Sequence, residues 1–394
     1  MRSALSVAMK TATVLGAVAA AATAIPLSAS AAPAGPPKDD SLPGVAVTSA
    51  TNAWAVGSYS DGTNSQTLIE RWNGSSWKTV TSPNRGGPGF DNDLIAVAAT
   101  SSSNAWAVGH WTDISLDHTE IEHWNGSSWK VSASPDPGSN PVTGSNDLFG
   151  VAAASAGRAW AVGTYTNDGS TYQSLILRWN GGSWTQATSQ NPGTAFDGLQ
   201  GITALSGSNA WAVGSYSNGG ANKTLIEHWN GANWTTKASP NVGTKGDNLF
   251  AVAGTSASNV WAVGDRFDGT ANQTLIEHWN GARWKVVKSP NPGGDRYEAL
   301  FGVTAISARD AWATGSYVVG STYMTMILHW NGFSWKQVKS PHPSGAEESF
   351  LADVASTRTG HVWAVGYYTV GASNRTLIAR FNGTSWKQVT SPNK

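Results

Sequence analysis

The sequence contains no cysteine, so no disulfide can stabilise the fold and burial of apolar surface must do so. Charged residues make up only 13% of the chain, and 25 basic groups balance 25 acidic ones. Such a surface lacks the basic footprint of a nucleic-acid-binding protein. No stretch of the chain reaches the roughly 20 consecutive apolar residues of a membrane-spanning helix. We therefore expect neither a nucleic-acid partner nor a membrane span.

The N-terminal region has the three parts of a secretory signal. Arg2 and Lys10 give it a positive start, and an apolar run over Val14–Ala24 follows. Small residues at positions 29–31 then supply a cleavage pattern. The sequence predicts a signal peptide over 1–31, a short N-terminal segment over 32–41 and a secreted, extracellular protein.

Tryptophan, in contrast, is abundant and recurs in a repeated unit. The unit reads Ala-Trp-Ala-Val-Gly, then Trp-Asn-Gly, then a further Trp three residues after that Gly. The first Trp recurs at steps of 52, 54, 51, 50, 51 and 51 residues, which is typical of a propeller blade. The seven first Trp residues are Trp54, Trp106, Trp160, Trp211, Trp261, Trp312 and Trp363.

Each unit divides into four short strand candidates separated by turn residues. In the second unit the candidates are 94–99, 105–108, 120–124 and 129–132, and Asn125-Gly126 forms the last hairpin. We therefore predict an all-β fold, a seven-bladed β-propeller with four antiparallel strands per blade, over residues 42–394. The expected blades are about 42–93, 94–147, 148–198, 199–248, 249–299, 300–350 and 351–394.

The turn of each unit carries a pattern that resembles known repeats. Gly74 and Trp77 match the Gly-x-x-Trp portion of the Asp-box, whereas Trp72 and Asn73 stand where the box has its Ser and Asp. The chain thus resembles secreted bacterial β-propellers of the Asp-box and kelch type, and the departure removes any inference of sialidase activity. It is also similar to actinomycete propeller lectins, including lectin-type subunits of toxin assemblies, and this resemblance implies glycan binding.

Two kinds of loop should lie on one face of the disc. The crossing between units and the loop between the second and third strands are the longest and most variable segments. The order of the strands brings both to the same end of each sheet. Because binding residues concentrate on loops held by a rigid scaffold, we expect the site on this loop face.

Acidic residues precede the innermost strand of every unit. If that strand lines the axis, the carboxylates crowd the channel mouth, where like charges raise their pKa values or attract a cation such as calcium. The alternative is that they accept hydrogen bonds from backbone N–H groups of the crossing loop. No other cofactor is expected. The predicted central acidic ring comprises Asp40, Asp93, Asp147, Asp197, Asp247, Glu298 and Glu348.

Aromatic residues recur five positions after the first Trp. Their flat faces suit stacking on sugar rings, while nearby amides and carboxylates bind hydroxyl groups. The alternative is packing at the edge of the blade. The predicted ligand-binding positions are Tyr59, Trp111, Tyr165, Tyr216, Arg266, Tyr317 and Tyr368, and Trp111 is the strongest single candidate.

Trp111 belongs to the least repeat-like stretch, residues 110–118. Two His and two Asp fall within these nine residues, but their spacing matches no strong metal motif. Solvated loop residues are the alternative, so the identity of any metal ligand stays open.

An enzyme would show residues that occur in one unit only and converge near the axis. No nucleophile elbow, phosphate loop or paired metal motif is present, no catalytic residue is assigned, and a binding role is favoured over an enzymatic one. The candidates for a glycan-active hydrolase or lyase are Asp265, Arg266, Asp268, Asp295, Arg296, Tyr297, His342 and Glu347.

The leading hypothesis is a secreted, lectin-like propeller that binds glycans or cell-surface polysaccharide through its loop face. The surface supports it, because Ser, Thr, Asn and Gly replace charged residues and suit neutral, hydroxyl-rich ligands. Two alternatives remain: a structural or targeting subunit that docks a secreted protein in an exported, toxin-type complex, and an extracellular glycan-active enzyme.

Overall fold

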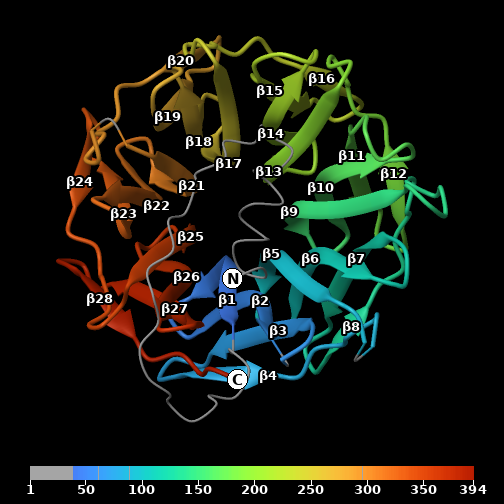
Figure 1. The fold of residues 1–394 in the computed structure, drawn as a ribbon, viewed down its shortest axis with the longest axis horizontal. Coiled ribbons are helices and arrows are strands. Elements are labelled where there is room, and N and C mark those ends of the chain that lie inside the picture. The colour runs from blue at the N-terminus through green and yellow to red at the C-terminus, as the bar shows by residue number, and fades with distance from the viewer. Residues whose placement is uncertain (1–38, 61, 88, 295) are drawn as a thin grey trace, which may run out of the picture.

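The computed structural model describes residues 39–60, 62–87, 89–294 and 296–394, which form strands arranged in a ring (Figure 1). The predicted signal peptide and Asp295 lie outside the described residues. Four antiparallel strands form each of seven blades, which confirms the predicted seven-bladed β-propeller. The described part contains no helix with the length and hydropathy that a membrane span requires.

Each blade takes its strands from one sequence repeat, and the innermost strand comes first. Blades 1 to 3 contain β1 (Asp40–Ser49), β2 (Asn52–Ser60), β3 (Ser65–Trp72), β4 (Trp77–Val80), β5 (Asn92–Ser101), β6 (Asn104–Thr112), β7 (Asp117–Trp124), β8 (Trp129–Val131), β9 (Ser145–Ser155), β10 (Arg158–Thr166), β11 (Gln173–Trp179) and β12 (Trp184–Ala187). Blades 4 and 5 contain β13 (Phe196–Ser206), β14 (Asn209–Ser217), β15 (Lys223–Trp229), β16 (Trp234–Thr236), β17 (Gly246–Ser256), β18 (Asn259–Phe267), β19 (Asn272–Trp279) and β20 (Trp284–Val286). Blades 6 and 7 contain β21 (Glu298–Ser307), β22 (Asp310–Val319), β23 (Thr322–Trp330), β24 (Trp335–Val338), β25 (Glu348–Ser356), β26 (Val362–Val370), β27 (Ser373–Phe381) and β28 (Trp386–Val389).

The Asn-Gly pair of each unit sets the outer hairpin. In blade 1, Asn73 Oδ1 accepts hydrogen bonds from the N–H groups of Ser75 (2.9 Å) and Ser76 (3.0 Å). Gly74 has a φ of 101°, a backbone region that glycine adopts without the steric cost of a Cβ. The predicted hairpin is confirmed, and it explains why Asn-Gly recurs.

The first Trp of each blade packs into the next blade. The ring centroid of Trp54 in blade 1 lies 4.9 Å from that of Trp124 and 5.1 Å from that of Trp129, both in blade 2. Trp54 is fully buried, and it joins one apolar cluster with residues of both blades. Because Trp buries a large area and favours such tilted and edge-to-face contacts, the repeated Trp residues hold neighbouring blades together.

Small residues occupy the places where innermost strands approach one another. A Cβ added to Gly44 of β1 would lie 2.8 Å from the backbone oxygen of Ile95 and 2.9 Å from the Cα of Ala96. A Cβ at Gly201 of β13 would lie 2.8 Å from the Cα of Ala251. A larger side chain would push the strands apart, so the axis is assembled through close backbone contacts.

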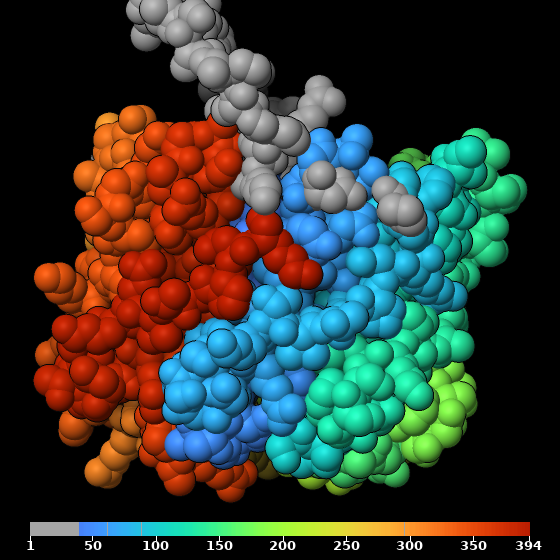
Figure 2. Space-filling view, turned by 90° about the horizontal axis from the view of Figure 1, so that it is seen from below, coloured from blue at the N-terminus to red at the C-terminus, as the bar shows by residue number. Residues whose placement is uncertain are grey.

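Blade 7 closes the ring on blade 1 with the contacts that join sequence neighbours. Trp363 of blade 7 lies 4.9 Å from Trp72 of blade 1, centroid to centroid. The backbone N–H of Lys394 donates to Asp40 Oδ2 at 2.7 Å. Figure 2 shows the red C-terminal residues lying against the blue first blade. Closure therefore needs no strand exchanged between the chain ends.

A buried glutamate accepts a hydrogen bond across several of these seams. Ser391 Oγ donates to Glu70 Oε1 at 3.0 Å across the closing seam, and Ser239 Oγ donates to Glu277 Oε2 at 2.8 Å between blades 4 and 5. Burial, only partly offset by these hydrogen bonds, raises the pKa of each carboxyl group to about 8. Both groups are therefore largely protonated at neutral pH.

The crossing loops and the loops between second and third strands lie on one face. Asn222 directly follows the β14–β15 loop, and it forms a parallel bridge with Gly246, which directly follows the crossing into blade 5. Asp117 and Ser145 form the equivalent bridge between blades 2 and 3. Both kinds of loop thus meet at this end of the sheets, as expected for the loop face.

Candidate functional site

A cavity of about 1180 Å³ runs between the innermost strands of all seven blades. Residues that follow the repeated leucine of each innermost strand line it and are mostly apolar; the rings of Phe250 and Phe301 lie 5.6 Å apart. A large apolar cavity with few polar groups is the usual form of a ligand site. The seven residues are Pro43, Ile95, Phe149, Gln200, Phe250, Phe301 and Ala352.

Four polar side chains form a hydrogen-bonded chain on the wall of this cavity. Asn222 Nδ2 donates to Asn248 Oδ1 (2.9 Å), and Asn248 Nδ2 donates to Asp265 Oδ1 (2.9 Å). Asn272 Nδ2 donates to Asp265 Oδ2 (2.8 Å). All four residues line the cavity, and they come from the facing loops and strands of blades 4 and 5. Each amide keeps a second N–H, so the chain offers donors and acceptors together.

Asp265 is the centre of this polar chain. It is only 4% exposed, and burial raises its pKa to about 6, against the opposing effect of the hydrogen bond from Asn248. The equivalent position of the other blades holds Ser58, His110, Thr164, Ser215, Ser316 and Tyr367. A carboxylate at this position is therefore a feature of blade 5 alone.

Aromatic side chains of blades 6 and 7 continue the wall beside the polar chain. The ring of Phe350 lies 5.0 Å from that of Tyr367 and 4.8 Å from that of Tyr323, stacked on both. Tyr297, Phe350 and Tyr367 line the cavity. Burial, and next the nearby charge of Asp265, raises the pKa of Tyr297. The polar chain and the aromatic wall are therefore neighbours.

Asp353 adds one more carboxyl group to the cavity wall, at the closing seam. Its Oδ2 accepts a hydrogen bond from the backbone N–H of Val45 in blade 1 (3.0 Å), and its Oδ1 accepts one from Val354 N–H (2.8 Å). Burial raises its pKa to about 7. The other six blades have Gly or Ala here: Gly44, Ala96, Gly150, Gly201, Ala251 and Gly302.

None of the seven residues of the predicted acidic ring lines the cavity. Asp197 Oδ1 and Asp247 Oδ1 accept hydrogen bonds from the crossing-loop N–H groups of Gly193 (2.8 Å) and Gly243 (2.9 Å). Glu298 accepts the same bond from Gly293, and Asp40 accepts one from Lys394. Three of the carboxylates thus hold crossing loops and Asp40 holds the C-terminal residue, which is the arrangement of the alternative expectation. A role of these residues in binding a ligand or cation stays a prediction.

The seven acids also do not form one ring, because they differ in register. Successive side chains of a strand point to opposite faces, and the offset from the repeated leucine varies. Asp93 and Asp147 directly precede it, Asp40, Asp197, Asp247 and Glu298 precede it by two residues, and Glu348 precedes it by three.

Asp93 and Asp147 instead face a histidine that only blade 2 carries at this position. Both ring nitrogens of buried His110 lie 3.6 Å from a carboxylate oxygen, one of Asp93 and one of Asp147. Close by in sequence, Glu120 is 1% exposed, and neither of its carboxylate oxygens has a hydrogen-bond partner among the described residues. Burial raises the pKa of Glu120 to about 8. Blade 2 therefore buries two titratable side chains, His110 and Glu120, at positions where its neighbours have uncharged residues.

The predicted aromatic positions are partly buried beside the seams between blades. Tyr165, Tyr216, Tyr317, Tyr368 and Tyr59 each pack against an apolar seam cluster. Arg266 bonds to Gln273 at 2.6 Å. None of the seven positions lines the central cavity, so their role in ligand binding stays a prediction.

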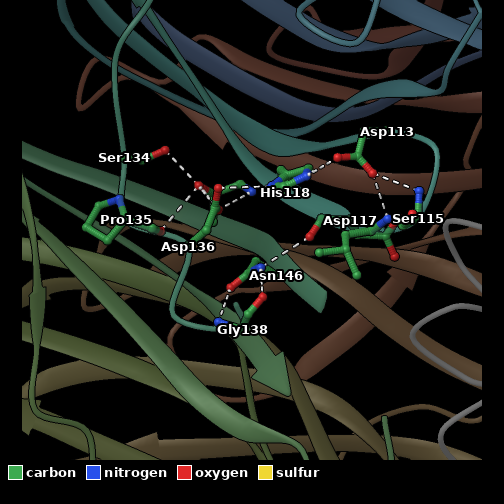
Figure 3. A network of polar contacts seen from close by, with 11 residues as sticks. Asp113, Ser115, Asp117, His118, Ser134, Pro135, Asp136, Gly138 and Asn146 are labelled. Carbon is green, nitrogen blue, oxygen red and sulfur yellow. Dashed lines mark hydrogen bonds and ion pairs between the residues drawn. The ribbon is translucent and has the colours of Figure 1, made fainter. Parts of the chain in front are cut away.

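The ring of Trp111 stacks on that of His118, with the two centroids 4.4 Å apart. His118 lies between two carboxylates (Figure 3). Its Nε2 is 3.0 Å from Asp113 Oδ2, and its Nδ1 is 3.2 Å from Asp136 Oδ2. Hydrogen bonds from Ser115 and from His118 hold the pKa of Asp113 down to about 2. The described residues contain no group of three or more His, Asp or Glu side chains placed to hold a metal ion.

Of the residues that occur in one unit only, the structure brings Asp265 and Tyr297 to the cavity. Arg296 bonds to the carbonyl of Gly320, and Glu347 Oε1 accepts from Gly371 N–H. Asp268 caps its own loop, Arg266 points to Gln273, and His342 bonds to Ser349. The two cavity residues are thus the ones with access to a ligand there.

The predictions from the sequence do not include the three asparagines of the polar chain, Phe350 and Tyr367 of the aromatic wall, or Asp353. Asp353 had a readable signal, since an acid replaces the Gly or Ala of six other units. The asparagines had none, because Asn is common in every loop of this chain.

Comparisons with known proteins show the fold. No family model and no curated protein matches the chain. The structure of YCF48 from Cyanidioschyzon merolae is 12% identical, with a TM-score of 0.53 over 89% of this chain and 98% of that one. A polysaccharide lyase, an ulvan lyase with bound saccharide, is 12% identical, with a TM-score of 0.51 over 84% and 92%. YCF48 bound to a D1 peptide is 15% identical, with a TM-score of 0.49 over 85% and 90%.

Proposed function

We propose that this chain is a secreted carbohydrate-binding propeller that holds a neutral, hydroxyl-rich glycan at the loop-face mouth of its central cavity. The observation that carries the proposal is the polar chain centred on Asp265, placed beside the aromatic wall. Sugar hydroxyls both donate and accept hydrogen bonds, and the amides and carboxylate offer both kinds of partner. Aromatic rings offer apolar faces for the C–H side of a pyranose.

The rest of the molecule fits such a ligand. The surface carries few charges and no net charge, which suits a neutral partner. One solved structure with this fold, the ulvan lyase, is described with a bound saccharide of glucuronate and sulfated rhamnose, which supports a carbohydrate ligand but not its neutrality. The fold alone does not assign the function, because propellers serve many activities; the polar and aromatic groups of the cavity wall are what supports the proposal.

The test exchanges Asp265 for the residue that three other blades use. Asp265→Ser removes the carboxylate and keeps a side chain that blades 1, 4 and 6 accommodate. A glycan found by array screening should bind at least about tenfold more weakly to this variant, the loss expected for one or two hydrogen bonds. Calorimetry measures it. The matched control is Asp268→Asn, which removes a charge from the same blade but keeps the acceptor that caps its loop.

The result also separates the alternatives. Absence of glycan binding by the wild type, or equal binding by Asp265→Ser, would contradict the cavity proposal. Weaker binding in Trp111→Ala or Tyr216→Ala, with Asp265→Ser unchanged, would place the sugar at the predicted aromatic positions instead. Depolymerisation of the glycan would establish the hydrolase or lyase, and repetition with calcium and with a chelator would show whether a cation contributes.

A second role, docking of a secreted protein, has one observation in its favour. Ile114 is 89% exposed and Val142 is 80% exposed, and both lie in loop-face segments of blade 2. Exposed apolar side chains that gather on one face mark interaction surfaces. Copurification of a partner from culture fluid that is lost in the Ile114→Ser, Val142→Ser double variant would support this role, and a monomeric secreted form would contradict it.

A further inference from the structure

In six of the seven blades, an Asn or Asp side chain accepts a hydrogen bond from the same backbone N–H of the third strand. We call this side chain the plug. In blade 1, the backbone N–H of Thr67 donates to Asn84 Oδ1 at 2.8 Å. The acceptor always lies 17 residues after the donor, and the bond measures 2.8 or 2.9 Å throughout. The plugs are Asn84, Asp136, Asn191, Asn241, Asn291 and Asn393.

Blade 6 lacks this plug. The residue 17 positions after Thr325 is His342, and its Nδ1 lies 2.7 Å from Ser349 Oγ instead. No side-chain acceptor for the Thr325 N–H is present among the described residues. A pocket of about 290 Å³ opens at this place, lined by Tyr317, Met324, Thr325, Gln337, Val338, Lys339, Ser340 and His342.

The chemistry of the missing plug defines what the pocket can accept. Five of the six plugs are asparagine side chains, which end in an acetamide-like group. The Thr325 N–H needs an oxygen acceptor, because a buried donor without a partner costs about 1–3 kcal/mol. The Thr325 hydroxyl cannot take its place as a donor to the ligand, since it already lies 2.6 Å from the Pro341 carbonyl oxygen.

The surroundings of the pocket fit a sugar that carries such a group. Tyr317, one of the predicted aromatic positions, is half-buried and presents a ring at the pocket wall. Met324, its cross-strand partner, supplies an apolar contact for a methyl group. Lys339 and Gln337 are exposed at the rim, where they can bind hydroxyl groups.

We propose that the blade 6 pocket binds the acetamido group of an N-acetylated sugar. The carbonyl oxygen accepts from the Thr325 N–H, the methyl group contacts Met324, and the pyranose ring lies against Tyr317. The ligand takes the place that an asparagine side chain of the protein takes in five other blades. This site is separate from the central cavity, and it rests on the proposed function only for the class of ligand.

The test restores the plug. His342→Asn gives blade 6 the asparagine of its neighbours, and His342→Asp gives it the aspartate of blade 2. The wild type is titrated with N-acetylglucosamine and, separately, with glucose, while the amide resonances of Thr325 and Tyr317 are followed by NMR. We expect saturable shifts with N-acetylglucosamine, at least about tenfold weaker binding of glucose, and loss of the shifts in both variants.

Three results would overturn the proposal: no shift at Thr325 with N-acetylglucosamine, undiminished shifts in folded His342→Asn and His342→Asp, or a stronger response to glucuronate, which would indicate a carboxylate pocket. The melting temperature of each variant should equal or exceed that of the wild type, so loss of binding cannot be read as misfolding. Asp265→Ser should leave the shifts unchanged. Shifts at Thr325 in a protein whose cavity binds no glycan would contradict the cavity proposal and support the pocket.

Discussion

The seams between blades and the wall of the central cavity use the repeat in opposite ways. At the seams every blade presents the first and the last Trp of its repeat, and Trp54 and Trp363 make closely similar contacts in the first and last blades. On the cavity wall and in the blade 6 pocket, single blades depart from the repeat, as at Asp265, Asp353 and His342. Repetition therefore marks the scaffold, and departures from it mark places where one blade differs in chemistry.

Residues that depart from the repeat carry a cost in stability that the residues at repeated positions do not. Asp265 and Asp353 are carboxyl groups where the other blades, apart from His110 in blade 2, have small or hydroxyl side chains, and burial raises the pKa of both. Buried carboxyl groups destabilise a fold unless they are well paired. Reversion of each departure to the residue of the other blades therefore separates its role in the fold from its role at a site.

The largest effect should come from a repeated seam position. Trp211→Ala removes a ring that is 1% exposed and lies 5.0 Å from Trp279 of the next blade. It should lower the free energy of unfolding by about 3–5 kcal/mol, as for other large-to-small changes in a core. Chemical denaturation measures the loss. Trp111→Ala, the tryptophan outside the repeat, serves as the control and should cost far less.

A smaller effect of opposite sign is expected at Glu120. The six other blades have Leu or Met at this position, so Glu120→Leu should raise the free energy of unfolding by about 1–3 kcal/mol. The folded-state pKa of about 8 exceeds the ordinary value of 4.5. The wild type therefore loses stability as pH rises from about 4.5 to 8, and the variant should lose less. Melting temperatures at pH 5 and pH 8 test this, and an advantage that shrinks at high pH would contradict it.

The smallest effect should come from Asp353→Gly, which restores the glycine of blades 1, 3, 4 and 6 at the closing seam. The variant loses the hydrogen bond from Val45 but also a buried carboxyl group, so its stability near pH 5 should change by under about 1 kcal/mol. The pKa of Asp353 is raised from 3.8 to about 7. The contribution of Asp353 to the free energy of unfolding therefore declines as pH rises through that window. The variant should have a flatter pH dependence of melting temperature between pH 4 and 7. If the variant and the wild type had the same pH dependence of melting temperature, Asp353 could not be the cause of that dependence.

The fold could be predicted because its determinants repeat. Asn73-Gly74 and its equivalents specify each outer hairpin, and the regular recurrence of Trp54 and its equivalents gives the number of blades. Each of these signals is local in sequence, so it can be read without knowing how distant residues meet.

The candidate site could be predicted only in part. Repetition marks the aromatic and acidic positions in the sequence, whereas Asp265 and Tyr297 stand out because the other units lack them. The register of Asp93 and Asp147 against the repeated leucine decided which way their side chains point, and a shift of one residue sends a side chain to the other face. Asn222, Asn248 and Asn272 meet Asp265 only through the contact of blades 4 and 5, which no local pattern reports.

The bond from Lys394 to Asp40 and the packing of Trp363 on Trp72 have a further meaning. They make the closing seam equivalent to the seams that the chain itself bridges, so no blade is structurally first. A polypeptide opened at any crossing and joined through a short linker between residues 394 and 39 would meet the same neighbours in the same order. The order of the blades in the gene is thus one of several that could encode this disc.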